Sequence, residues 1–326
     1  MIIDCHSHYH AHGIGGSVFT QMYGHTVIDI LPSKGDDEAH LQLMSDRGYS
    51  MQFLSQPPFT QAHDLDPRIG IGQSRAFNDA IAKAVENDPD HFRGIASLPL
   101  QDIPASVKEM ERAIRDLGML AVMINPDISR RGTGPTQEEE YWFPIYEKAC
   151  ELDVPLFIHP GSSALCRHSN YSLGLHLGFL FGETEFVLTF IFGRVFEKFP
   201  DLKILVCHGG GAIPAHYGRF QASTEPDFRT GKPRTPMDGT FLDNLKKMYF
   251  DTCMYSQEGI ECLIKVVGAD RCLFATETPG MGYARRGDGR SYDNVEDYIN
   301  GISWLSQEER NQIFFQNAIK LFKLDI

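Results

Sequence analysis

The sequence predicts a single domain, residues 1–326, folded as a (β/α)8 TIM barrel. Eight short apolar runs alternate with segments of helical periodicity, which is typical of parallel strands joined by right-handed crossovers. A chain of 326 residues is long enough for one such barrel. Several runs end in histidine or glutamate, and functional residues gather at the carboxyl ends of barrel strands. A doubly wound open sheet is the alternative, but it would bring fewer of these residues together.

The strands are predicted from short apolar runs rich in β-branched and aromatic residues. The first strand opens the chain with Ile2 and Ile3, and a polar, glycine-rich segment, residues 9–35, follows it. A connection of this length in a compact domain is usually functional or disordered. The other seven runs are residues 51–54, 92–98, 121–125, 155–159, 203–208, 248–252 and 272–277.

Helices are predicted where apolar residues recur every three or four positions. Residues 74–87 carry Phe77 and Ile81 at this spacing, and residues 136–152 have three glutamates near their start, where the helix dipole favours negative charge. The remaining predicted helices are residues 36–46, 106–117, 184–199, 258–267, 295–302 and 306–322, so that helices also end the chain.

Composition narrows the class of protein. A hydrophobic content of 42% and a charged content of 22% are typical of a soluble globular protein. The net charge of −13 argues against a nucleic-acid surface, although it does not exclude a small anionic substrate. Seven scattered cysteines predict reduced thiols in the cytoplasm. No signal peptide begins the sequence and no uncharged apolar run is long enough to cross a bilayer, so we expect no membrane partner.

The predicted site begins with His6 and His8, which lie two positions apart and therefore point to the same face of a strand. His159 ends the fifth run, His208 the sixth and Glu277 the eighth. In a barrel all five side chains face one mouth. Three neutral imidazoles and a carboxylate suit zinc or manganese and leave a position open for water or substrate. His208 and Glu277 are each predicted to be either a metal ligand or a proton carrier.

Four motifs carry a resemblance to a known family: residues 4–8 (DCHSH), 157–160 (FIHP), 207–214 (CHGGGAIP) and 273–279 (LFATETP). In this order they resemble the amidohydrolase superfamily, in the branch of aminocarboxymuconate semialdehyde decarboxylase, aromatic-acid decarboxylases and 4-oxalomesaconate hydratase. The resemblance implies one divalent ion, zinc or alternatively manganese, held by His6, His8 and His159. It places His208 near the ion without requiring that it bind.

One position departs from the decarboxylase pattern. Decarboxylases of this branch usually carry Asp where this chain has Glu277, whereas 4-oxalomesaconate hydratases resemble the chain here and over residues 208–220 and 250–255. The leading prediction is therefore a metal-dependent hydratase of a small polycarboxylate from aromatic catabolism. A non-oxidative decarboxylase is the alternative within the lyases. The sequence also leaves open a metal-dependent hydrolase and a non-catalytic metal-binding barrel.

Substrate-binding residues are predicted from their ability to grip a carboxylate. A guanidinium binds a carboxylate through two parallel hydrogen bonds, which makes Arg219, Arg285 and Arg286 candidates. Arg285 and Arg286 could equally form a solvated surface pair, and Arg219 could cap a helix. Tyr255 is a weaker candidate. The expected partner is a small carboxylate, and assembly into a homo-oligomer is compatible with the sequence.

Overall fold

The computed structural model describes residues 1–10, 36–61, 63, 65–129, 132–161 and 173–326. Most of the predicted long connection after the first strand, residues 11–35, lies outside the described residues. Eight strands form one sheet in which chain neighbours are also spatial neighbours and every pair is parallel. The strands are β1 (Ile3–His8), β2 (Met51–Ser55), β3 (Phe92–Ala96), β4 (Ala121–Ile124), β5 (Leu156–Ile158), β6 (Ile204–Val206), β7 (Tyr249–Asp251) and β8 (Cys272–Leu273).

The sheet closes on itself between β1 and the segment that continues β8. The backbone N–H of Cys5 donates to the carbonyl of Phe274 at 3.0 Å, and the N–H of Glu277 donates to the carbonyl of His6 at 2.8 Å. Ser7 and Thr278 form a further parallel bridge. The predicted TIM barrel is therefore confirmed, and the open sheet is excluded.

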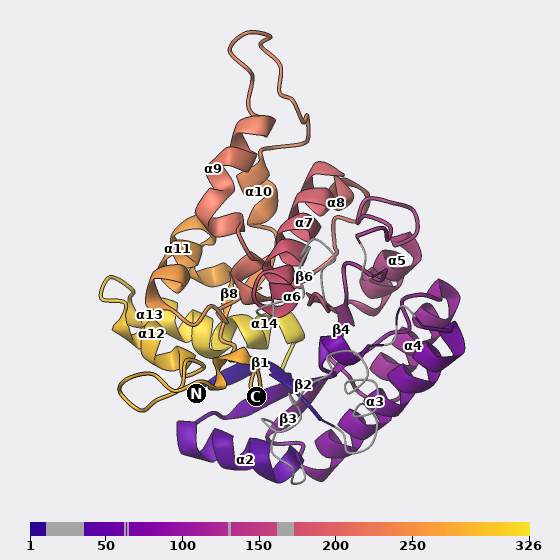
Figure 1. The fold of residues 1–326 in the computed structure, drawn as a ribbon, viewed down its shortest axis with the longest axis vertical. Helices are drawn as coiled ribbons and strands as arrows, with labels where there is room; N and C mark the ends of the chain where they lie inside the picture. Colours follow the sequence, from indigo (N-terminus) through magenta and orange to yellow (C-terminus); the bar gives the residue numbers. More distant parts are fainter. Residues whose placement is uncertain (11–35, 62, 64, 130–131, 162–172) are drawn as a thin grey trace.

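Helices surround the barrel (Figure 1). Those of the described residues are α2 (Asp36–Arg47), α3 (Pro67–Asn87), α4 (Ile103–Arg115), α5 (Phe143–Leu152), α6 (Leu173–His176), α7 (Gly178–Phe192), α8 (Val195–Lys198), α9 (Ile213–Thr224), α10 (Phe241–Leu245), α11 (Gln257–Val267), α12 (Val295–Gly301), α13 (Gln307–Asn311) and α14 (Asn317–Phe322). A π-helical turn, Gln312–Gln316, joins α13 to α14, so the last predicted helix is one continuous helical segment.

Several helix boundaries differ from the predicted ones for local reasons. Helix α3 begins at Pro67, seven residues before the predicted start, because the Asp66 side chain caps its N-terminus and proline suits the first helical position. The helix predicted at residues 184–199 is two helices, because Arg194 adopts a left-handed conformation with φ of 62° between α7 and α8. Helix α9 was not predicted at all.

Apolar residues alternate between two layers of the core. Phe157 faces the barrel interior, whereas its neighbours Leu156 and Ile158 pack against the surrounding helices. At the amino-terminal end of the strands, Phe322 of α14 packs on Phe53 with ring centroids 4.3 Å apart, so this helix closes the barrel interior. His159 lies two residues beyond Phe157, at the opposite end, where the barrel opens.

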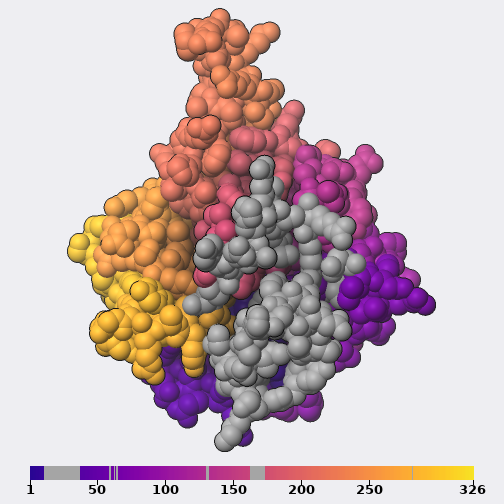
Figure 2. Space-filling model, viewed as in Figure 1, coloured from indigo at the N-terminus to yellow at the C-terminus, as the bar shows by residue number. Residues whose placement is uncertain are grey.

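Two further features complete the fold. Residues 173–192 meet the length and composition of a membrane-spanning helix, but Phe186, Val187 and Phe190 of this stretch are buried in the core. Residues 225–240, between α9 and α10, project from the body of the molecule (Figures 1 and 2). Phe228 on this projection is 90% exposed.

Candidate metal centre

The barrel mouth gathers four potential ligands: His6 and His8 from the end of β1, His159 after β5 and Glu277 after β8. One ligand atom from each lies within 4.8 Å of the others, and all four side chains are buried. The structure thus brings together the four residues that the sequence nominated as ligands. Their separation in sequence is large, and the barrel topology alone places them side by side.

The donor atoms fit a divalent cation. The Nε2 atoms of His6 and His159 are buried, and neither has a hydrogen-bond partner among the described residues. An unpaired buried polar atom costs about 1–3 kcal/mol, which a cation at this position would offset. Three imidazole nitrogens and one carboxylate oxygen are a donor set that zinc and manganese both accept.

Each histidine is held through its other ring nitrogen. Nδ1 of His6 lies 2.8 Å from Asp251 Oδ2, and Nδ1 of His8 lies 3.1 Å from Ser55 Oγ. Nδ1 of His159 lies 3.0 Å from the carbonyl oxygen of Pro160. Because a carboxylate and a carbonyl accept hydrogen bonds from the Nδ1–H groups of His6 and His159, the Nε2 lone pairs of these two rings remain available to a metal.

Burial also keeps two of these imidazoles in the ligand form. Desolvation lowers the pKa of His8 and of His159 well below the ordinary value, and the neighbouring histidines lower it further. A neutral imidazole is the state that binds a metal.

Asp251 and Ser55 were not predicted from the sequence as part of the site. Each ends a strand, β7 and β2 respectively, so the available signal was a polar residue at the carboxyl end of an apolar run. Asp4 was missed as well: its carboxylate accepts hydrogen bonds from Gln52 Nε2 and from the Thr276 hydroxyl, at 2.9 and 2.6 Å. It ties β1 to β2 and to the segment after β8, and burial raises its pKa to about 6.

Glu277 and His208 are in direct contact. Nε2 of His208 lies 3.0 Å from Glu277 Oε1, and the Tyr255 hydroxyl donates to Glu277 Oε2. Burial alone would raise the pKa of Glu277, but His208 outweighs it and the pKa falls well below the ordinary range. Burial alone would lower the pKa of His208, but Glu183 and Glu277 outweigh it and raise that pKa well above its ordinary value.

Glu183 is the second carboxylate on His208, and its Oε1 atom contacts His208 Nδ1. It comes from the middle of α7, and burial raises its pKa to about 7. Glu183 was not predicted from the sequence as part of the site. A charged residue inside a strongly apolar helix was the signal that could have identified it.

The backbone at the mouth is unusual at three site residues. His208, Tyr255 and Glu277 have φ values of 47°, 55° and 60°, in the left-handed region that residues other than glycine seldom occupy. Such conformations cluster at functional sites, where the surrounding structure holds them. Gly211, with φ of 63°, closes the turn after His208, and a Cβ there would lie 2.3 Å from the carbonyl oxygen of Leu180.

Of the four predicted substrate-binding residues, Tyr255 contacts a candidate metal ligand, whereas the three arginines have other surroundings. Tyr255 contacts Glu277, as described above. Arg219 is exposed on α9 and makes no side-chain hydrogen bond or ion pair with any described residue. Arg286 is largely buried: it donates to Asp297 Oδ2 at 2.8 Å and lies over the ring of Tyr298. Arg285 is exposed and donates to the carbonyl of Gly289 at 3.1 Å.

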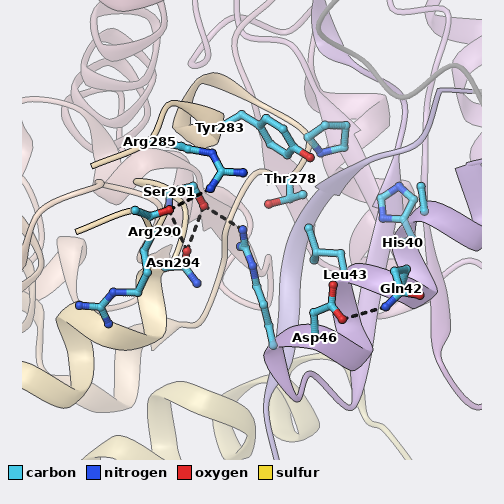
Figure 3. Close-up of a pocket in the computed structure, with 14 residues that line it drawn as sticks. His40, Gln42, Leu43, Asp46, Thr278, Tyr283, Arg285, Arg290, Ser291 and Asn294 are labelled. Carbon is cyan, nitrogen blue, oxygen red and sulfur yellow. Dashed lines mark hydrogen bonds between the residues drawn. The ribbon is translucent and has the colours of Figure 1, made fainter. Parts of the chain in front are cut away.

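Arg285 lines a pocket of about 470 Å³ between α2 and the segment after β8 (Figure 3). Arg285 and Tyr283 lie on one side of this pocket, and His40 and Gln42 lie on the other. Thr278, the residue that follows Glu277, also lines it. The pocket therefore borders the chain segment that carries the candidate metal-binding carboxylate.

A family model, a sequence relative and a solved structure all relate this chain to the same family of proteins. The model of the family described as Amidohydrolase matches residues 3–324. The 2-keto-4-carboxy-3-hexenedioate hydratase of Sphingobium sp. strain SYK-6 is 31% identical over 99% of this chain and 96% of its own. The crystal structure of 4-oxalomesaconate hydratase from Rhodopseudomonas palustris superposes with a TM-score of 0.78 and 29% identity, covering 99% of this chain and 96% of that one.

A second activity occurs among the relatives. The gamma-resorcylate decarboxylase of Polaromonas sp. strain JS666 is 28% identical over 88% of this chain and 87% of its own. Hydratases and decarboxylases therefore both share this barrel over most of its length.

Proposed function

We propose, from the premise that this chain belongs to the amidohydrolase family, that it is a metal-dependent lyase which hydrates an unsaturated oxo-polycarboxylate. The observation that carries the proposal is the buried contact between Glu277 and His208, next to the three candidate metal-binding histidines. The 31% identity to a hydratase of a carboxylated keto-hexenedioate supports this substrate class.

In this proposal His6, His8, His159 and Glu277 hold one divalent ion, with zinc as the first candidate and manganese as the alternative. When bound, the ion supplies Lewis-acid polarisation of a substrate oxygen and a lowered pKa for water. The protein residues supply orientation and proton transfer. Tyr255 and His208, on opposite oxygens of Glu277, fix the direction of its carboxylate.

Hydration adds a hydroxyl group to one carbon of a conjugated double bond and a proton to its neighbour. We assign the proton taken from water to Glu277 and the proton given to carbon to Nε2 of His208. The two groups are 3.0 Å apart, so the proton on Glu277 can then return to His208. After this proton transfer Glu277 and His208 have their original protonation states, and the net change is the addition of one water molecule to the substrate.

Decarboxylation is the second candidate, and the identity to gamma-resorcylate decarboxylase favours it. His208 would again protonate carbon, but the bond broken would join that carbon to a carboxylate. A purely metal-binding barrel would not require the contact between His208 and Glu277, whereas a metal-dependent hydrolase could also use it. The longer side chain of Glu277, where related decarboxylases carry Asp, is the reason that hydration is preferred.

Substrate carboxylates require cationic partners, and Arg285 is the candidate best placed for this role. It is exposed, and the pocket that it lines is bordered by Thr278, next to Glu277. Arg286 is already engaged by Asp297, and Arg219 lies exposed on α9. We keep both as secondary candidates, with Tyr255 as a contact near the reacting carbon.

Location and assembly are proposals of the same kind. Six cysteines among the described residues are free thiols, which supports a reducing compartment such as the cytoplasm. Assembly into a homo-oligomer is compatible with the extended projection between α9 and α10.

The test combines metal analysis with a substrate screen. Protein of known metal content is offered unsaturated oxo-dicarboxylates and oxo-tricarboxylates beside dihydroxybenzoates, while absorbance and carbon dioxide are followed. Loss of the conjugated absorbance without carbon dioxide is the expected result. Release of carbon dioxide with equal stoichiometry would establish the decarboxylase instead.

Two variants of Glu277 sharpen this test. Glu277→Gln keeps the shape of the side chain but removes its basicity, so a proton-transfer role predicts retained metal and lost turnover. Metal loss would instead indicate that Glu277 is mainly a ligand. Glu277→Asp shortens the reach by about 1 Å, which can cost on the order of a hundredfold in a hydratase. A decarboxylase site should tolerate it.

A further inference from the structure

His208 is held at both ring nitrogens by carboxylates from different parts of the barrel. Nε2 faces Glu277 at the mouth, at 3.0 Å, whereas Nδ1 contacts Glu183, which points inward from α7. Glu183 is completely buried. An imidazole between two carboxylates donates through both N–H groups when it is protonated, and only one of these groups faces the mouth.

Glu183 stands out within its own helix. Helix α7 is otherwise strongly apolar on its buried side, with Phe179, Phe186 and Val187 packed in or near the core. Oε2 of Glu183 has no hydrogen-bond partner among the described residues, so the described contacts of this carboxylate converge on His208. A buried carboxyl group is costly unless it is paired, and groups of this kind cluster at functional sites.

The same helix holds the turn that carries His208. The ring of Phe179 stacks on the ring of His208 with centroids 5.9 Å apart and planes inclined by 22°. The hydroxyl of Thr184 accepts a hydrogen bond from the backbone N–H of Ala212 at 2.9 Å. Contacts from one helix therefore fix the ring face, the ring nitrogen and the following turn, at a position where the His208 backbone is left-handed.

We propose that Glu183 is the positioning residue of His208: by accepting a hydrogen bond from the Nδ1–H group it fixes the ring orientation and reserves Nε2 for proton transfer at the barrel mouth. In the hydration cycle the Nε2 proton passes to the substrate carbon, and the neutral ring keeps its Nδ1 proton on the side of Glu183. The proton from water then reaches Nε2 through Glu277. The catalytic part of this proposal rests on the proposed function, whereas the tautomer of His208 does not depend on it.

The first measurement is therefore spectroscopic. Protein labelled with ¹⁵N-histidine shows which nitrogen of each ring carries a proton, and the resonances of His208 are those missing from His208→Asn. In the wild type Nδ1 should carry a proton as well as Nε2, and in Glu183→Leu the neutral ring should keep only the proton on Nε2, toward Glu277. An Nδ1 proton that persists unchanged in Glu183→Leu would overturn the proposal, whatever reaction the protein catalyses.

The second measurement is kinetic, with the substrate identified in the screen above. Glu183→Gln should lower kcat on the order of 10²–10³-fold, by analogy with the carboxylate that orients a catalytic histidine, while KM and metal content stay within about twofold. Glu185→Gln, an exposed carboxylate on the same helix, is the matched control and should behave as wild type.

A double variant separates positioning from general stabilisation. If Glu183 acts through His208, adding Glu183→Gln to His208→Asn should cause no further loss of turnover, because the group that it orients is absent. Multiplicative losses would show that Glu183 acts elsewhere and would overturn the assignment. If Glu183→Gln folds poorly, Glu183→Asp replaces it, and the ¹⁵N spectrum of that variant must still show an Nδ1 proton. Failure of every substrate would count against the proposed function alone.

Discussion

The two ends of the barrel interior are built from the same strands but obey different physical rules. At the floor, which we define as Met51, Phe53, Leu321 and Phe322, every side chain is apolar and closely packed. At the mouth, a few residues farther along the strands, two buried ring nitrogens have no hydrogen-bond partner within the described part of the chain, and the backbone is left-handed at His208 and Glu277. The packing of the floor stabilises the fold. The unpaired nitrogens and the left-handed backbone of the mouth cost stability, and such costs are typical of functional sites.

The difference between floor and mouth predicts that variants at the two ends of the barrel will affect different properties. A change at the mouth should remove metal or turnover and leave the fold intact, whereas a change at the floor should weaken the fold and leave the chemistry of the surviving molecules unchanged. The variants below test this separation, beginning with the largest expected effect.

The double variant His6→Ala/His8→Ala should lose the bound metal and all measurable activity, because two of four donors are removed. Its melting temperature in the metal-free state should match that of metal-free wild type, since the ligands contribute little to the packed core. Metal analysis and thermal unfolding measure the two quantities. His91→Ala, at an exposed histidine, is the control. Full metal occupancy in the double variant would refute the ligand assignment.

His208→Asn should keep the metal and lose roughly two to four orders of magnitude in kcat, the usual scale for a general acid–base group. The reason is that His208 contacts Glu277 rather than completing the four-residue donor set. Metal analysis shows whether the ion is retained, and steady-state kinetics measure the loss in kcat. A stoichiometric loss of metal would make His208 a ligand and leave Glu277 as the proton-transfer group.

At the floor, Phe53→Ala should reduce the free energy of unfolding by about 3–5 kcal/mol, because it removes a fully buried ring that packs on Phe322. Below its melting temperature the variant should keep metal stoichiometry and kcat. Denaturant unfolding gives the first quantity. Phe228→Ala, at a ring that is 90% exposed, should change stability by less than about 0.5 kcal/mol. A folded Phe53→Ala protein without metal would break the proposed separation.

Asp251→Asn tests a smaller effect within the mouth. The carboxylate accepts a hydrogen bond from the Nδ1–H group of His6, and its loss should weaken metal binding by about 10–100-fold without abolishing it. Competition with a chelator measures the affinity. Asp270→Asn, at an exposed aspartate, should leave the affinity unchanged. An unchanged affinity in Asp251→Asn would mean that the orientation of His6 is fixed by other contacts.

The fold could be predicted because its signals are local. Runs such as residues 51–54 and 121–125 are short and apolar, and their alternation with helices leaves few architectures to consider. The gathering of His6, His159 and Glu277 followed from that architecture, since each residue lies near or just beyond the carboxyl end of a strand. The ends of helices were predicted less well: the cap at Asp66 and the left-handed Arg194 depend on single side chains that periodicity does not register.

The residues that orient the site could not be predicted in the same way. Glu183 lies on a helix, and its contact with His208 depends on how α7 packs against the barrel. Asp251 and Ser55 end strands, but a polar strand end has no particular meaning until the facing ring nitrogen is known. Arg286 looked equivalent to Arg285 in sequence, and only the structure shows that Asp297 and Tyr298 already engage it.

The smallest expected effect concerns the pocket between α2 and the segment after β8. Arg285→Ala should raise KM about tenfold and leave kcat unchanged, because an exposed guanidinium that grips a remote carboxylate contributes to binding more than to the chemical step. Saturation kinetics with the identified substrate measure both constants, and Arg68→Ala, at an exposed arginine of α3, is the control. If Arg219→Ala raises KM and Arg285→Ala does not, the carboxylate is bound from the side of α9, and the pocket beside Thr278 is not its site.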